Sequence, residues 1–197
     1  MVVILPLGDN EEIKFLDKSK NLKIIHIRSS DCCYPYNHVF FSEIGKLIYF
    51  KNTFLKNIDD DEDIAFIQNR RYFENISTLS ISNENEVITA PFETFCNLKS
   101  QFDSCHHKYS SIFENILNEY ELNDILNERS FNPHNIFIAK KKFVEKYANF
   151  LEKMFLKYFD ESFNDKGGAW MAERLLFAFL KKNNYNIKQM PFKEISK

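Results

Sequence analysis

Apolar residues along this chain fall into short continuous runs, which alternate with longer segments where they recur every three or four positions. The short runs predict strands at residues 2–7, 23–27, 64–67, 86–90 and 136–139, with a last strand within 186–192. The longer segments predict helices at 42–54, from 110 or 111 onward, at 140–159 and at 170–182. Because strands and helices alternate, the sequence predicts an α/β fold. We expect a single mixed, mostly parallel sheet flanked by helices, Rossmann-like, in one domain over residues 1–197.

Polar and small residues at the ends of these segments predict where the helices begin. Asp9 or Asn10 is expected to cap a short helix starting at Glu11, and Ser42 is expected to cap the helix that follows it. The side chains expected to face inward from the short helix are Ile13, Phe15 and Leu16. The pair Gly167-Gly168 predicts a loop before the last helix.

The run at residues 64–67 is the most informative of the predicted strands. It is continuously apolar, which is typical of a central strand buried on both faces. Polar and aromatic residues follow it at once: Gln68, Asn69, Arg70, Arg71 and Tyr72. In open α/β sheets, ligands bind at the carboxyl ends of the strands. We therefore expect these side chains to form part of a substrate-binding site.

Composition and charge limit the classes of function. The 197 residues are 44% hydrophobic and 27% charged, with a net charge of -2, which is typical of a globular domain. The slight negative charge and the lack of a wider basic stripe argue against nucleic-acid binding. The four cysteines form no CxxC pair, so reduced thiols are expected, and no apolar run approaches the roughly 20 residues that span a bilayer. We expect a cytoplasmic protein, which is compatible with peripheral association at the inner face of the membrane.

Two stretches of the sequence carry a resemblance to a known family. The first runs from Glu43-Ile44-Gly45-Lys46-Leu47, through Lys51-Asn52, to Ile67-Gln68-Asn69-Arg70-Arg71-Tyr72-Phe73. The second runs from Asn135-Ile136-Phe137-Ile138 to Ala172-Glu173-Arg174-Leu175-Leu176. In order and rough spacing they resemble a bacterial domain-of-unknown-function family linked to capsular and exopolysaccharide synthesis, across about residues 37 to 192.

That family is glycosyltransferase-like, so the resemblance implies a GT-A type fold and transfer of a sugar. The implied partners are a nucleotide-sugar donor and a glycan or lipid-linked glycan acceptor. The chain departs from the family at two places: Gln68-Asn69 stand where the family has His-Tyr, and Asn135-Ile136 where it has Asn-Met. These departures leave room for a donor or acceptor other than the family norm.

The resemblance also sets a contrast with metal-dependent GT-A enzymes. In those enzymes the equivalent strand ends in Asp-x-Asp, which holds a divalent ion such as Mn²⁺ or Mg²⁺ against the donor diphosphate. Here the strand end carries Arg70 and Arg71, whose guanidinium groups bind phosphate bidentately. The hypothesis is that they replace part of the metal's work. The alternative is a structural ion pair, and we expect one arginine of each kind.

Acidic and amide residues supply the remaining candidates. Glu173 resembles the carboxylate that deprotonates the acceptor hydroxyl, and its alternative role is an ion pair with Arg174 or with either arginine of the strand end. Glu43 is expected to hold an arginine or to be exposed. Asn135 is expected to reach a sugar hydroxyl or to close a turn. Arg174 joins the substrate-binding candidates through the resemblance.

Two other groups of residues suggest chemistry and are interpreted as surface. The acidic run 59–63 contains an Asp-x-Asp, but it precedes the central strand and is expected at the opposite end of the sheet. Cys105-His106-His107, with Cys96 upstream, matches no zinc spacing and is expected to be polar surface near a core cysteine. His38 and His134 stand alone in turn-like segments, which makes each a weak candidate for ligand contact.

The leading hypothesis is therefore a glycosyltransferase that moves a sugar from a nucleotide-activated donor to a growing cell-surface glycan. One alternative is transfer of a phosphorus-containing group to capsular sugar. Another is a catalytically inactive member that binds glycan or a partner protein, which the missing Asp-x-Asp favours. The donor sugar, the acceptor, the stereochemistry and the oligomeric state stay open.

Overall fold

The computed structural model describes residues 1–15 and 21–195, and its main feature is a six-stranded sheet. The strands are β1 (Val2–Leu7), β2 (Lys23–Arg28), β3 (Asp63–Phe66), β5 (Glu86–Thr89), β8 (Phe137–Lys140) and β9 (Asn186–Gln189), in the order β2-β1-β3-β8-β5-β9. β8 is antiparallel to both of its neighbours, and the other neighbouring pairs are parallel. The α/β class and the mixed, mostly parallel sheet are confirmed.

Two small antiparallel sheets are separate from this sheet. β4 (Arg71–Phe73) pairs with β10 (Phe192–Glu194), and β6 (Glu93–Thr94) pairs with β7 (Ser130–Phe131). The β4–β10 pair brings the end of the described chain onto the segment that follows β3. This long-range pairing, together with β9, replaces the one final strand expected from the sequence.

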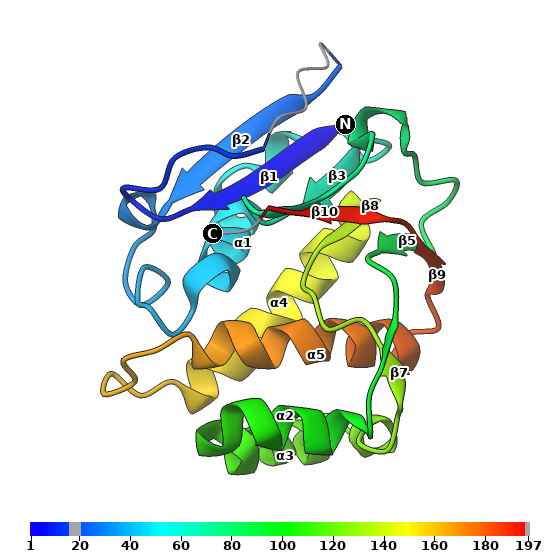
Figure 1. The fold of residues 1–197 in the computed structure, drawn as a ribbon. Coiled ribbons are helices and arrows are strands. Elements are labelled where there is room, and N and C mark those ends of the chain that lie inside the picture. Colours follow the sequence, from blue (N-terminus) through cyan, green and yellow to red (C-terminus); the bar gives the residue numbers. More distant parts are fainter. Residues whose placement is uncertain (16–20, 196–197) are drawn as a thin grey trace.

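The α-helices are α1 (Ser42–Thr53), α2 (Leu98–His106), α3 (Ser110–Glu119), α4 (Lys141–Tyr158) and α5 (Gly167–Lys182). All five gather on one side of the sheet, with α1 and α4 against it, α5 packed on both of these helices, and α2 and α3 beyond α5 (Figure 1). Short 3-10 helices lie at Ser29–Asp31, Leu55–Asn57, Ile76–Thr78, His107–Tyr109 and Asn123–Ile125. None of the described helices is long and apolar enough to cross a membrane.

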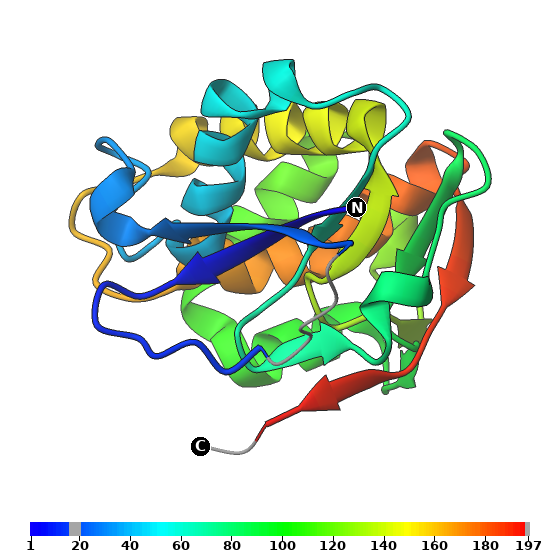
Figure 2. The ribbon, with the colours of Figure 1, turned by 90° about the horizontal axis from the view of Figure 1, so that it is seen from above.

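Alternation along the strands divides the core into two clusters. Ile64 and Phe66 of β3 face the helices, whereas Ala65 and Ile67 face a smaller cluster that contains no residue of an α-helix. That second cluster is covered by Phe15, Tyr72 and other residues of the irregular segments (Figure 2 views the molecule from this side). The continuous apolar run at 64–67 is therefore buried on both faces, as its sequence predicts.

Three features of the helices differ from what the sequence predicts. Residues 11–15 are irregular, so the short helix from Glu11 is absent there; Ile13 is 46% exposed, and Leu16 lies outside the described residues. Ser42 does not cap α1: it is the helix's first residue, with φ 44°, and its hydroxyl donates to the side chain of Glu43. The helix α2 was missed, because its polar surface residues dilute the apolar period.

The pair Gly167-Gly168 forms the first turn of α5, not a loop before it. A Cβ atom on Gly167 would lie 2.3 Å from Cζ of Tyr109, and one on Gly168 would lie 2.7 Å from the carbonyl oxygen of Phe40. The two glycines therefore let α5 begin directly against the segment before α1 and against the start of α3. This close approach places Glu173, two turns into α5, near the sheet.

Candidate functional site

The chain makes a tight turn at the carboxyl end of β3. Backbone hydrogen bonds run in both directions between Gln68 and Arg71, each with an N–O distance of 3.0 Å. The parallel strands β1, β2 and β3 end at this edge of the sheet, and β8 begins there because it is antiparallel. This is the edge at which open α/β sheets bind ligands, and the turn lies on it as predicted.

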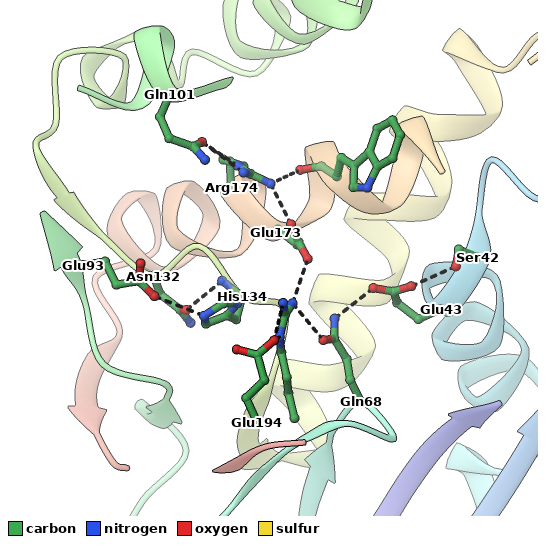
Figure 3. Close-up of polar contacts among 12 residues, drawn as sticks. Ser42, Glu43, Gln68, Glu93, Gln101, Asn132, His134, Glu173, Arg174 and Glu194 are labelled. Carbon is green, nitrogen blue, oxygen red and sulfur yellow. Dashed lines mark hydrogen bonds and ion pairs between the residues drawn. The ribbon is translucent and has the colours of Figure 1, made fainter. Parts of the chain in front are cut away.

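Arg71 is the centre of a polar network at this turn, and Figure 3 labels its partners Gln68, Glu173 and Glu194. Its Nε and Nη2 each lie 2.8 Å from Oε1 of Glu194 on β10, and its Nη1 donates to Oε1 of Gln68 at 3.4 Å. Nη1 also lies 3.9 Å from Oε1 of Glu173. The arginine thus links the turn after β3, the end of β10 and α5.

Glu173 is a nearly buried carboxylate, with its side chain 14% exposed. Its Oε2 accepts from Nη1 of Arg174 at 2.6 Å. Burial raises the pKa of Glu173 to about 7, against the lowering effect of Arg174 and Arg71, and the neighbouring charge of Glu43 raises it further. A carboxyl group in this environment exchanges its proton near neutral pH, which is what a general base requires.

Arg174 binds Glu173 and is itself fixed by contacts with α2 and α5. Its side chain is 4% exposed, and its Nε and Nη2 donate to Oε1 of Gln101 on α2 at 3.1 and 3.0 Å. Nη1 donates to the carbonyl oxygen of Trp170 at 2.9 Å. Because all of these contacts are with groups of the protein, the role of Arg174 in this network is to hold the carboxylate of Glu173 in place.

Glu43 joins the network from α1. Its Oε1 accepts from Nε2 of Gln68 at 2.9 Å, and its Oε2 accepts from the hydroxyl of Ser42 at 2.9 Å. Glu43, Gln68, Arg71 and Glu173 therefore form a continuous polar chain, drawn in Figure 3. Four of the residues expected from the sequence, taken from three separate segments, are brought together here.

The structure places three other candidates outside this network. Asn69 is held by the loop after β1, where its Oδ1 accepts from the backbone N–H of Lys14 at 2.7 Å. Tyr72 is 7% exposed and packs edge-on against Phe15. Asn135 is fully buried, and its Oδ1 accepts from the hydroxyl of Tyr147 at 3.1 Å.

Arg70 diverges from Arg71 and lies towards the loop after β1. Its positive charge contributes to a lowered pKa of Glu11 in that loop, although burial, which acts the other way, is the larger single effect on that carboxyl. The Nε atom of Arg70 is buried without a hydrogen-bond partner in the described part of the chain. One arginine is thus enclosed in a network of protein partners and the other is not.

Sequence reasoning missed Glu194, Glu93 and Gln101, and it gave His134 little weight. Nε2 of His134 lies 3.2 Å from Oε1 of Glu93, and burial, with help from the charge of Arg71, lowers the pKa of this histidine. His134 precedes β8, and antiparallel pairing places it at the carboxyl end of β3. No local signal marks Glu194 or Gln101, because each meets its partner only through long-range pairing or packing.

The segments set aside as surface also have clear positions. The acidic run lies at the amino end of β3, as expected, where Asp63 and Asp60 each pair at 2.8 Å with Lys140 and Lys141 respectively. Cys96 and Cys105 are exposed, so the expected core cysteine is wrong. His106 stacks on Trp170 with 4.4 Å between ring centroids, and burial lowers its pKa to about 4.

Carboxylates at the β3 end do not fit a divalent ion. Arg70 and Arg71 stand where metal-dependent GT-A enzymes have Asp-x-Asp. The carboxylate of Glu43 is bound by Gln68 and Ser42, and that of Glu173 is bound by Arg174. Within residues 1–15 and 21–195, no three histidine, cysteine, aspartate or glutamate side chains are grouped as metal ligands would be.

Comparison with known proteins supports the fold. No protein-family model matches the chain, and no curated protein sequence matches it. Among solved structures, the apo form of the bifunctional glycosyltransferase WbbM resembles it with a TM-score of 0.72 and 11% sequence identity. The match covers 99% of this chain and 45% of the WbbM chain, so this chain spans less than half of that protein's length. The chain therefore has the fold of a portion of a glycosyltransferase.

Proposed function

We propose that this protein is a glycosyltransferase that moves a sugar from a nucleotide-activated donor to a growing cell-surface glycan. The observation that carries the proposal is Glu173, a carboxylate of raised pKa beside Arg71. Arg71 follows β3 at its carboxyl end, where open α/β sheets bind ligands. The fold shared with WbbM supports the proposal of glycosyl transfer. The capsular or exopolysaccharide context and the glycan or lipid-linked acceptor rest on the family resemblance.

The chemistry needs one base and a stabilised leaving group. Glu173, in its ionised form, accepts the proton of the acceptor hydroxyl while the hydroxyl oxygen bonds to the anomeric carbon. The bond from that carbon to the donor diphosphate breaks, and the nucleoside diphosphate leaves with the electron pair. Near pH 7 about half of the Glu173 groups are ionised, given a pKa of about 7.

Arg71 and Arg174 prepare the base for this step. Both carry fixed positive charge, and each lowers the pKa of Glu173 from the higher value that burial alone would impose. Arg174 is the closer of the two, and Gln101 fixes its guanidinium plane. The network thus orients the carboxylate before substrate binds, which reduces reorganisation during the reaction. We assign Glu43 and Gln68, on the other side of Arg71, to hydroxyl groups of the donor sugar.

The test is a transfer assay with a panel of nucleotide sugars and oligosaccharide acceptors, with free nucleoside diphosphate as the readout. The Glu173→Gln variant keeps the side chain's size and removes the base. Glu145→Gln, on the exposed face of α4, is the matched control. We expect at least one donor to be consumed by the wild type and the control, and a roughly 10²–10⁴-fold slower rate in Glu173→Gln.

Three results would oppose the proposal. The first is the absence of any nucleotide sugar that raises the melting temperature or is consumed, which would favour a glycan-binding or partner-binding role. The second is release of nucleoside monophosphate from a nucleoside diphosphate sugar, which indicates that the sugar was transferred together with a phosphate. The third is a near-normal rate in a well-folded Glu173→Gln variant, which removes Glu173 as the base.

A further inference from the structure

Lys46 on α1 is a buried ammonium group without a carboxylate partner. The residue is 5% exposed. Its Nζ donates to the hydroxyl of Ser29 at 3.0 Å and to the carbonyl oxygen of Ser42 at 3.1 Å. Both acceptors are neutral, and no carboxylate of the described chain lies within ion-pair distance of this nitrogen. A buried charge is costly unless an opposite charge compensates it.

Two further cations lie in the same neighbourhood. Lys166, in the loop before α5, is exposed and is close enough to Lys46 for its charge to lower the pKa of Lys46, after the larger effect of burial. Lys166 and Arg70 both act on Glu11, so the two share its surroundings. Neither forms an ion pair with a described residue. By contrast, Lys51, Lys157 and Arg174 on the helices each pair with a glutamate.

Carboxylates that face these cations already have donors of their own. Oε2 of Glu11 accepts from the backbone N–H of Gly8 at 2.9 Å, and its Oε1 accepts from Nδ2 of Asn69 at 3.0 Å. Oδ1 of Asp9 accepts from the backbone N–H of Ser30 at 2.8 Å. Glu43 is bound by Gln68 and Ser42. These carboxylates act on the cations at longer range, and their direct contacts are with neutral groups.

The interactions of the three cations lie near the carboxyl ends of β1 and β2. Lys46 donates to Ser29, the residue that follows β2. The charges of Arg70 and Lys166 act on Glu11, in the loop after β1. Figures 1 and 2 both place the loop between α4 and α5 on the side towards which these two strands run. Arg28, the last residue of β2, fixes the loop after β1: its Nη1 donates to the carbonyl oxygens of Gly8 at 2.7 Å and Asp9 at 2.9 Å. One turn of α1 separates Lys46 from Glu43, which begins the polar chain to Glu173.

We propose that Lys46, Arg70 and Lys166 bind the diphosphate of the donor nucleotide. This inference rests on the proposed function, and it assigns the leaving group to a place apart from the base. A nucleoside diphosphate leaves with several negative charges, and three cations without carboxylate partners neutralise it. The donor sugar then lies over Glu43 and Gln68, and its anomeric carbon faces Glu173. This assignment replaces the expected pair Arg70 and Arg71 with Arg70 and two lysines.

The test measures binding of inorganic pyrophosphate by titration calorimetry in the presence of a chelator. Lys166→Met removes an exposed charge and leaves the fold unaffected, and Lys46→Met removes the buried charge at similar volume. Lys56→Met, an exposed lysine without an ion pair, is the matched control. We expect the wild type and the control to bind alike and the two test variants to bind about tenfold or more weakly, since each loses a charge-assisted contact.

The outcomes separate this inference from the proposed function. Pyrophosphate binding that is unchanged in both test variants, or absent from the wild type, overturns the inference even if sugar transfer is found. Binding that is weakened in both variants and normal in Glu173→Gln supports it. That second pattern supports the inference even if every transfer assay fails, because Glu173 does not contribute to the diphosphate site.

Discussion

The two sides of the Gln68–Arg71 turn differ in how their charges are satisfied. On one side, Arg71 contacts Gln68, Glu194 and Glu173, and Glu173 is held in turn by Arg174. On the other side, Lys46 has only neutral partners, and the Nε atom of Arg70 has none in the described chain. Neighbouring arginines in a sequence therefore need not have the same role. The first side has its geometry before any ligand arrives, and the second has charges that a ligand compensates.

The first prediction distinguishes the two sides of the turn by their effects on kcat and on KM for the donor. Glu173→Gln should lower kcat by roughly 10²–10⁴-fold and leave the affinity for the donor within a few-fold, because the base acts on the acceptor. Lys166→Met should do the opposite, raising KM for the donor about tenfold with a smaller loss in kcat. Steady-state kinetics on both variants checks this. Equal losses of kcat in both would mean that the two sides do not act separately.

A second prediction concerns stability and pH. The pKa of Glu173 is raised from its ordinary 4.5 to about 7, so the folded state binds this proton more tightly than the unfolded state does. The resulting stabilisation is fully present below pH 4.5 and is lost as the pH rises through about 7. Its size is at most roughly 3.5 kcal/mol, from about 1.4 kcal/mol per pKa unit.

Denaturant unfolding at several pH values measures this effect. The free energy of unfolding of the wild type and of Glu145→Gln should fall between pH 4.5 and 7.5, and that of Glu173→Gln should fall less. Other titrating groups contribute equally to all three proteins, so the comparison isolates Glu173. The same slope in all three would show that Glu173 keeps an ordinary pKa.

The third prediction concerns Arg71, whose removal should shift the pKa of Glu173 and lower the rate by a smaller factor. Arg71→Met removes a positive charge 3.9 Å from Glu173, and that charge lowers the pKa of Glu173. The pKa should therefore rise above about 7 in the variant, and the base should be less ionised at pH 7. We expect a rate about tenfold lower at pH 7, recovered in part at pH 8.5. A loss that is constant across pH would mean that Arg71 acts on the substrate directly.

The smallest effect is expected from Gln101, two contacts away from the base. Gln101→Leu removes the acceptor of Arg174 Nε and Nη2 at nearly constant side-chain volume. The guanidinium of Arg174 then loses its fixed plane, and kcat should fall by a few-fold with KM unchanged. The measurement is kcat and KM at pH 7 and at pH 8.5. Glu145→Gln, on the exposed face of α4, is again the control.

Much of the fold follows from the pattern of the sequence, and the reason is physical. Strand β3 was predictable because the alternate residues of the run 64–67 pack into two different apolar clusters. No position of this run is therefore polar. The position of Gln68 and Arg71 followed from the rule for strand ends. The short helix expected from Glu11 failed because Glu11 instead bonds to Gly8 and Asn69, which fixes an irregular loop.

The missing parts of the candidate site depend on contacts that are distant in the chain. Glu194 reaches Arg71 only because β10 pairs with β4, and Gln101 reaches Arg174 only because α2 packs beside α5. Lys46 lies among the buried residues of α1, where an amphipathic pattern predicts an apolar residue. The burial of Lys46 could not be predicted, because the ammonium group of a lysine in a helix usually reaches solvent.

The most direct test of the central claim is the pH dependence of kcat at saturating donor and acceptor. We predict that kcat of the wild type rises with pH and reaches half of its maximum near pH 7, where Glu173 loses its proton. The Glu173→Gln variant should lack this rise, and Glu145→Gln should retain it. A wild-type profile that is flat between pH 5 and 8, or an unchanged rise in Glu173→Gln, would contradict the assignment of Glu173 as the base.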